Sequence, residues 1–210
     1  MTTLAKTKGD LLICCFVGML GAALLPVATA GEKPSAAQLI DDLMWNRGPI
    51  GGPFTLTDHE GKRRSSTEFT SKLLVIYFGY TYCPDICPLD LTAIADAIER
   101  LGSDSGKVQP LFITVDPERD TPERLALYVS SIHPRLVGLT GSAEEIGKVA
   151  LAYKAYFARS AGGSSVDYAV DHTSFIYFAD PTGEYLGFLP PATDTERSSQ
   201  AMKLLLGIPK

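Results

Sequence analysis

Two cysteines, Cys83 and Cys87, stand in the run Tyr82-Cys83-Pro84-Asp85-Ile86-Cys87-Pro88 and offer the most evident chemistry of the chain. A spacing of i and i+4 places two side chains on one face of a helical turn, so both sulfurs can reach the same atom. Thiols near a helix N-terminus ionise readily, and the thiolate is the form that binds metal and exchanges disulfides. The pair is therefore expected to chelate one metal ion or to form a reversible disulfide. A purely stabilising disulfide would close a very short loop and restrain the unfolded chain little.

A metal site here needs a further donor, because two thiolates rarely complete a coordination shell. An imidazole is the expected donor, and the chain has three histidines. His59 falls in a predicted turn, where a solvated side chain is expected. His133 lies at a predicted helix end, where we expect a surface residue or a partner for the helix dipole. His172 directly precedes a predicted buried strand, and from the residues alone it is either a ligand or a hydrogen-bonded core histidine.

The N-terminal residues have the features of a targeting segment. Lys6 and Lys8 precede an uncharged run, Leu11–Ala30, that ends in Ala-Thr-Ala. A basic start, an apolar stretch and such an ending are typical of a secretory signal peptide. The run is also just long enough for an uncleaved membrane anchor, since about 20 apolar residues span a bilayer. Both alternatives predict a protein outside the cytoplasm, in the bacterial periplasm, either soluble or anchored to the membrane.

Two further cysteines, Cys14 and Cys15, lie inside this apolar run. We expect Cys14 and Cys15 to serve as small apolar residues of this segment. Lipid attachment is the alternative, but bulky Ile13 stands where a small residue is expected. The chain of 210 residues fits one domain plus the targeting segment. Its net charge of −5 argues against a nucleic-acid partner, which favours a basic surface.

Hydrophobic patterning predicts alternating strands and helices. Residues 1–30 are the targeting segment, 31–48 a linker with a short amphipathic stretch, and 49–210 the folded domain. A Gly/Ser-rich mobile loop is expected at 160–166. The predicted elements are a hairpin over 54–65, strands at Leu73–Phe78, Leu111–Val115, Ser174–Phe178 and Glu184–Leu189, and helices at Leu89–Leu101, Pro122–Ile132, Ser142–Arg159 and Thr193–Ile208.

This order of elements predicts an α/β fold. Strands joined by helical crossovers run parallel, so the sheet is expected to be mixed, with helices on its faces and an N-terminal hairpin. In such sheets the chemistry lies beyond the carboxyl ends of the central strands. The loop with Cys83 follows the apolar strand that ends at Phe78, which is such a place.

Four segments of the chain together resemble the Sco/SenC family. They are Gly51–Lys62, Tyr77–Pro88, Thr114–Pro122 and Asp171–Thr173, and the resemblance covers roughly residues 45–208. The Cys-x-x-x-Cys motif and the later Asp-His pair are its specific parts, whereas the opening hairpin is shared with other thioredoxin relatives.

The resemblance implies a thioredoxin-like fold that binds copper through Cys83, Cys87 and His172. It also implies as partners the cytochrome c oxidase subunit with the dinuclear copper centre and a thiol reductant. His172 aligns with the cis-proline of thioredoxin-type enzymes, so its imidazole is expected to face the thiols. The donor types agree, because two soft thiolates and one imidazole suit copper or zinc, and structural zinc usually takes four protein ligands.

Two functions therefore compete. The first is a copper metallochaperone for cytochrome c oxidase; the alternative is a thiol–disulfide oxidoreductase whose redox-active pair is Cys83 and Cys87. A peroxidase of the peroxiredoxin type would need a single activated thiol, which the paired cysteines and Pro88 do not fit. His172 separates the first two functions, because only the copper site needs it.

Four other residues are expected near the site. Asp171 is a candidate to orient His172, although sequence neighbours often point apart. Asp116 ends a predicted central strand and is equally suited to capping a helix. Tyr80 and Tyr82 are expected to form walls of the site.

Overall fold

A mixed seven-stranded sheet is the scaffold of the protein, and the computed structural model describes residues 33–161 and 167–208. The described elements belong to one unit, Pro34–Lys210. The predicted targeting segment with Cys14 and Cys15, and most of the predicted loop at 160–166, lie outside the described residues. Within the described part of the chain, no helix is long and apolar enough to cross a membrane.

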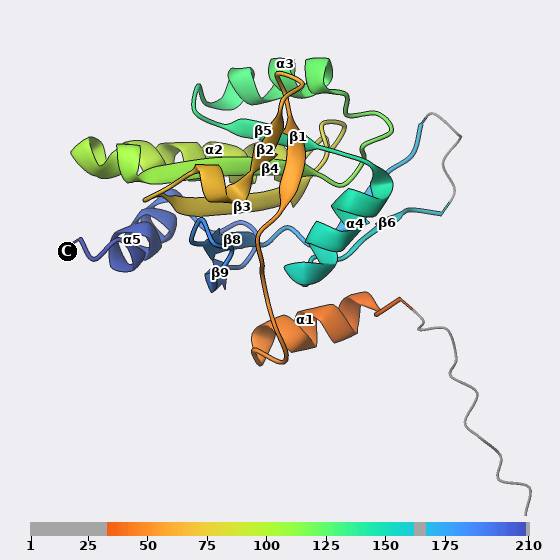
Figure 1. Ribbon diagram of the computed structural model, residues 1–210, viewed down its shortest axis with the longest axis horizontal. Helices are drawn as coiled ribbons and strands as arrows, with labels where there is room; N and C mark the ends of the chain where they lie inside the picture. The colour runs from red at the N-terminus through yellow and green to blue at the C-terminus, as the bar shows by residue number, and fades with distance from the viewer. Residues whose placement is uncertain (1–32, 162–166, 209–210) are drawn as a thin grey trace, which may run out of the picture. The chain divides into compact units, whose positions relative to one another are not determined.

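The strand order of the sheet is β2-β1-β5-β4-β3-β8-β9 (Figure 1). β3 is parallel to β4 and β4 to β5, and all other neighbours in this sheet are antiparallel. This arrangement confirms the predicted mixed α/β fold with an N-terminal hairpin. The strands are β1 (Thr55–Asp58), β2 (Arg63–Ser65), β3 (Leu73–Gly79), β4 (Val108–Thr114), β5 (Val137–Thr140), β8 (Ile176–Ala179) and β9 (Tyr185–Leu189).

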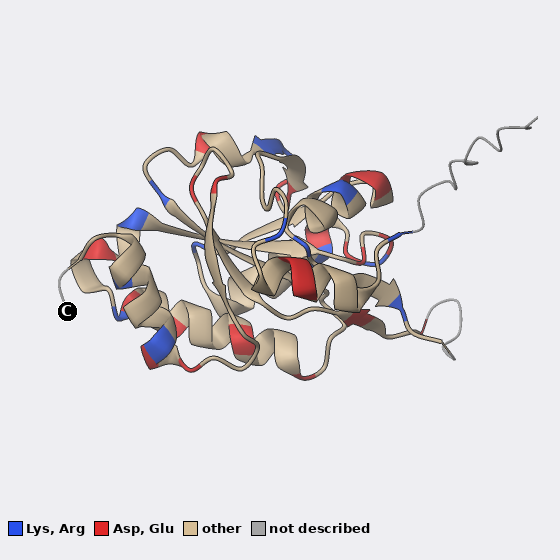
Figure 2. Cartoon of the chain, turned by 90° about the horizontal axis from the view of Figure 1, so that it is seen from below, with Lys and Arg blue, Asp and Glu red and all other residues tan. Residues whose placement is uncertain are grey.

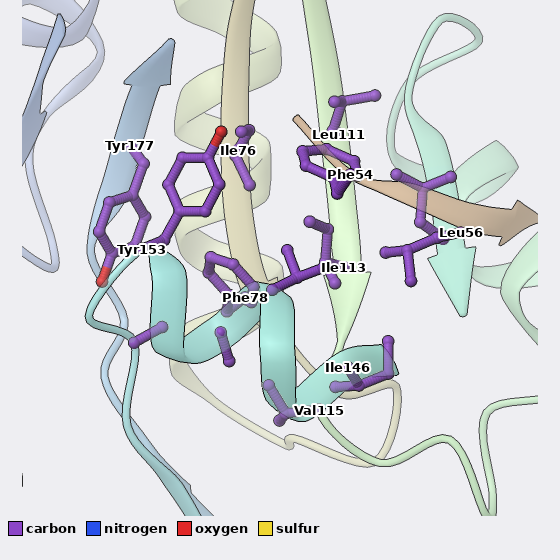
Figure 3. Packing of buried hydrophobic residues seen from close by; sticks show 14 of the residues in the cluster. Phe54, Leu56, Ile76, Phe78, Leu111, Ile113, Val115, Ile146, Tyr153 and Tyr177 are labelled. Carbon is purple, nitrogen blue, oxygen red and sulfur yellow. The ribbon is translucent and has the colours of Figure 1, made fainter. Parts of the chain in front are cut away.

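Helices pack on both faces of the sheet and create two apolar cores. One core includes residues of α2 (Ile86–Glu99), α3 (Pro122–Ile132) and α5 (Thr195–Leu205). The other includes residues of α1 (Ala36–Met44) and α4 (Ala143–Ala152). Figure 3 shows part of this second core, where strand side chains meet Ile146 and Tyr153. Two short 3₁₀ helices, Ser66–Glu68 and Gly102–Lys107, complete the described regular structure.

Strand β3 is buried on both faces, as its continuous apolar run predicts. Leu74, Ile76 and Phe78 point into the core beside α4, whereas Val75 and Tyr77 point into the core beneath α2. Figure 2 shows the central strands without charged residues, which lie on the surrounding helices and loops. Each fully buried aliphatic or aromatic side chain contributes roughly 1.5–3 kcal/mol. β3 is therefore a rigid base for the cysteine loop that follows it.

The predicted helix starts at Thr121 and Ser142 are confirmed. Thr121 caps α3, and Pro122 occupies its first turn, where the missing N–H is harmless. Ser142 and Glu145 form the expected capping box at the start of α4.

The predicted helix Ser142–Arg159 is wrong in its second half. α4 ends at Ala152, and Lys154 then has a φ of +57°, the left-handed conformation that terminates a helix. The chain continues into β6 (Phe157–Arg159), which pairs antiparallel with β7 (Val170–His172) in a separate two-stranded ribbon. The sequence pattern did not predict this ribbon or the short strand β5. Neither segment is long enough to show a clear hydrophobic period.

Helix α1 occupies part of the segment predicted as a linker. A capping box of Ser35 and Gln38 starts it, and its apolar side chains Leu39 and Leu43 are buried. Leu43 belongs to the same core as α4. The short amphipathic stretch noted in the sequence is thus a helix that packs on the domain.

Replacement of Leu43 by alanine tests this packing. We expect Leu43→Ala to lower the free energy of unfolding by about 2–4 kcal/mol, because it leaves a cavity in a core position that is 2% exposed. The neighbouring Met44 is 59% exposed, so Met44→Ala should change the free energy of unfolding by less than about 0.5 kcal/mol. Urea unfolding of the full chain gives both values. Equal effects of the two changes would contradict a structural role of α1.

Candidate metal centre

The cysteine loop leaves the sheet at Gly79, the last residue of β3. A methyl group on Gly79 would lie 2.9 Å from the Cys87 sulfur, so this position needs glycine for the sulfur to fit. Two hydrogen bonds hold the loop, from the Thr81 backbone N–H and hydroxyl to the buried carboxylate of Asp120, at 2.9 and 2.6 Å. Cys83 lies in this loop and is partly exposed, whereas Cys87 lies in the first turn of α2 and is fully buried.

His172 reaches the two cysteines from the end of β7. Its Nε2 atom is 3.4 Å from the Cys87 sulfur, although the two residues are 85 positions apart. The three donor atoms of Cys83, Cys87 and His172 all lie within 4.8 Å of one another, and both cysteines are free thiols. Among the described residues, this is the one group of three His, Cys, Asp or Glu side chains that could hold a metal ion.

The orientation of His172 leaves the correct nitrogen free for a metal. Its Nδ1 atom is 3.2 Å from the carbonyl oxygen of Thr173, and a carbonyl can only accept a hydrogen bond. Nδ1 therefore bears the proton, and the lone pair of Nε2 faces the sulfurs. The Tyr80 ring packs perpendicular to the imidazole at 5.7 Å between ring centres. Tyr80 is thus a wall of the site, as we predicted.

The two sulfurs differ in ionisation. The pKa of Cys83 is lowered to about 3, because the Cys87 thiol donates a hydrogen bond to its sulfur and two backbone N–H groups also favour the thiolate. The hydrogen bond to Cys83 and burial raise the pKa of Cys87. Asp85 caps α2 without a side-chain hydrogen bond, so the first N–H groups of the helix are free to face Cys83. The metal-free site therefore holds one thiolate near the surface and one thiol inside.

A buried polar pair lies beneath Cys87, and the sequence analysis missed it. The Tyr77 hydroxyl donates to the Asp90 carboxylate at 3.0 Å, and the backbone N–H of Ala192 donates to the same carboxylate at 3.0 Å. Burial raises the pKa values of both Asp90 and Tyr77. An acidic residue on the apolar face of α2, three positions after Cys87, was the available signal.

The other candidate residues do not join the donor cluster. Asp171 is exposed, and it alternates with His172 along β7, so it does not orient the imidazole. His59 accepts a hydrogen bond from the Gly138 N–H. His133 is the C-cap of α3, the helix-end position that we predicted, and it pairs with Glu99 at 3.0 Å. It is buried, so the alternative of a surface residue is wrong.

Comparisons with known proteins identify the family. A family model described as SCO1/SenC matches residues 44–207. The chain belongs to the SCO1/SenC family. This SCO1/SenC protein is 39% identical over 197 residues to the mitochondrial SCO2 homolog of Bos taurus, which covers 92% of this chain and 73% of the relative. It is 40% identical over 173 residues to the mitochondrial SCO1 homolog of Homo sapiens, covering 80% of this chain and 58% of the relative.

A solved structure of the same family has the same fold. The crystal structure of Arabidopsis thaliana ScoI with copper bound is 40% identical in sequence and superposes with a TM-score of 0.69. The match covers 74% of this SCO1/SenC chain and 98% of that chain. The thioredoxin-like fold and the family resemblance expected from the sequence are thereby confirmed.

The unequal thiols predict selective alkylation. At pH 6 we expect iodoacetamide to modify Cys83 at least about tenfold faster than Cys87, because Cys83 is a partly exposed thiolate and Cys87 a buried thiol. The rate at Cys83 should be flat from pH 5 to 8, since its pKa of about 3 lies below this window. Peptide mass mapping measures both rates. In guanidinium chloride the alkylation rates of the two cysteines should become equal. Equal rates in the folded protein would contradict the assignment of the thiolate to Cys83 and the thiol to Cys87.

Proposed function

We propose that this protein is a copper metallochaperone that binds copper through Cys83, Cys87 and His172 and takes part in cytochrome c oxidase assembly. The observation that supports it best is the convergence of three soft donors, within 4.8 Å, from the cysteine segment and β7. The copper-bound state of the Arabidopsis relative supports the choice of metal. The part in cytochrome c oxidase assembly rests on the family resemblance of the motifs.

The donor set suits copper better than structural zinc. Zinc in structural sites usually takes four protein ligands, whereas the described cluster has three. Two thiolates and one imidazole are soft enough for Cu(I), which accepts three ligands. Copper is here a cargo, and the partly exposed sulfur of Cys83 is the donor that an incoming partner ligand reaches first. Cys87 is the donor that must lose a proton when the metal binds, because ligating thiols are deprotonated.

A thiol–disulfide oxidoreductase is the second candidate, and the low pKa of Cys83 favours it. An ionised thiolate beside a second thiol can attack a partner disulfide, and Cys87 can then resolve the mixed disulfide. The partner gains two electrons from the pair and one proton from Cys87, takes a second proton from water, and Cys83 and Cys87 become a disulfide. A thiol reductant must then restore the dithiol. Oxidation would also remove both sulfur ligands from copper, so the two functions are linked through the same atoms.

Copper affinity of a histidine variant tests the first function. The full chain is used with Cys14→Ser and Cys15→Ser, so that only Cys83 and Cys87 supply thiols. We expect His172→Ala to lower the Cu(I) affinity at least about 100-fold, because loss of an outer-shell partner alone already costs about 10–100-fold. Competition with a chromophoric chelator measures it. His59→Ala is the matched control and should keep the wild-type affinity, since His59 contacts Gly138 instead.

An unchanged affinity of His172→Ala would show that the three-ligand site is wrong. Thiol–disulfide exchange on a model disulfide, measured with the same variants, then decides between the functions. Exchange that persists together with an unchanged copper affinity would favour the oxidoreductase.

We further infer that the protein works outside the cytoplasm, in a bacterial periplasm, either soluble or anchored through residues 11–30. The delivery partner would be the cytochrome c oxidase subunit that contains the dinuclear copper centre. The two relatives compared above are mitochondrial proteins. The domain would extend over 49–210 with helix α1 packed on it, preceded by the targeting segment at 1–30.

The mass of the protein purified from its own membrane and soluble fractions tests this location. A signal peptide predicts a chain that begins at Gly31, and an anchor predicts the intact chain in the membrane fraction, because an uncleaved apolar segment of this length spans the bilayer. An intact chain in the cytoplasmic soluble fraction would contradict both.

A further inference from the structure

The ribbon that contains His172 is separate from the main sheet. Among the strands of the described residues, β6 and β7 pair only with each other, and His172 lies opposite Phe157 in this ribbon. The cysteines belong instead to the end of β3 and the start of α2. The imidazole is therefore held beside the sulfurs by the short connection from His172 to β8, which begins at Ile176, and by side-chain contacts between the ribbon and the rest of the domain.

Tyr168, four residues before His172, makes the first of these contacts. Its hydroxyl donates to the Asp116 carboxylate at 2.7 Å, and both residues are buried. Asp116 follows β4, so this bond joins the ribbon segment to the edge of the main sheet. The second carboxylate oxygen of Asp116 accepts from Nε of Arg119 at 2.5 Å.

Arg119 joins the ribbon to the cysteine loop. Its guanidinium carbon lies 3.6 Å from the centre of the Tyr168 ring, and Arg159 of β6 lies 3.7 Å from the same ring centre. The same Arg119 carbon lies 4.5 Å from the Tyr82 ring and 5.9 Å from the Tyr80 ring. Cations packed on aromatic faces away from water are strongly held. The partly buried guanidinium of Arg119 thus lies against Tyr168, four residues before His172, and against Tyr80 and Tyr82, which precede Cys83.

Tyr80 completes the link. Its ring packs edge-on against the imidazole of His172, at 5.7 Å between ring centres. The three residues Asp116, Arg119 and Tyr168 are not among the metal donors. They hold the ribbon at a fixed distance from the cysteine loop without reaching the metal themselves.

We propose that the Asp116–Arg119–Tyr168 cluster positions His172 against Cys83 and Cys87, and that it determines how much of the copper affinity the imidazole supplies. This proposal rests on the proposed copper site. The three residues are positioning residues, and their effect on copper passes through His172. A change that breaks contacts within the cluster displaces the His172 imidazole and lowers its contribution to the copper affinity. The two sulfur ligands, Cys83 and Cys87, keep their positions.

The test uses Tyr168→Phe, which removes only the hydroxyl and keeps the ring, and Arg119→Gln, which removes the guanidinium. Both are made in the full chain with Cys14→Ser and Cys15→Ser. We expect each to lower the Cu(I) affinity about 10-fold or more, as outer-shell changes do. In the His172→Ala background the same changes should alter the affinity by less than about twofold, because the residue through which they act is gone.

Two controls separate positioning from a general loss of structure. Tyr153→Phe removes the hydroxyl of another buried tyrosine, which donates to the Gly52 carbonyl, and should keep the wild-type affinity. The NMR resonance of the His172 ring in the metal-free, reduced chain reports its place beside Tyr80. Tyr168→Phe should move this resonance toward its unfolded value.

The outcomes distinguish this proposal from the proposed function. Equal losses of affinity with and without His172 would overturn the positioning role, as would an unchanged His172 resonance in both variants. A wild-type chain that binds no copper but shows the shifted resonance in Tyr168→Phe would refute the copper site and retain the positioning role.

Discussion

The burial of β3 on both faces is the constraint on which the site depends. Its side chains alternate between two apolar cores, so the strand cannot slide by one residue without exposing them. The strand ends at Gly79, and this glycine leaves room for the Cys87 sulfur directly behind the sheet edge. The position of the cysteine loop is therefore determined by core packing, and the site does not need metal to order two of its three ligands.

Electrostatics then makes the two sulfurs unequal. The free N–H groups at the start of α2 and the Cys87 thiol stabilise a thiolate on Cys83, while burial keeps the proton on Cys87. The partly exposed Cys83 thiolate and the buried Cys87 thiol suit a site that passes its metal ion to another protein. The Cys83 sulfur is accessible for ligand exchange, and the Cys87 sulfur remains covered. The same asymmetry suits attack on a disulfide, which explains why the cysteine pair alone does not separate the two functions.

The third donor is held in a different way from the first two. His172 lies on a two-stranded ribbon that side chains attach to the domain, with Arg119 packed between Tyr168 and the tyrosines of the cysteine loop. Hydrogen-bonded sheet neighbours hold β3 far more firmly than such contacts hold a ribbon. The imidazole is consequently the ligand whose position the surrounding side chains can adjust.

The elements with a local signal were predictable from the sequence alone. The apolar run of β3, the caps Thr121 and Ser142 and the cysteine pair were all evident, because caps and periodic patterns involve residues close along the chain. The motif resemblance also pointed to His172. Only the tertiary structure decided where α4 ends, that β6 and β7 pair, and that Arg119 lies between ribbon and loop. These features depend on contacts between segments far apart in sequence, such as the 85 positions between Cys87 and His172, and packing energy of that kind leaves no local pattern.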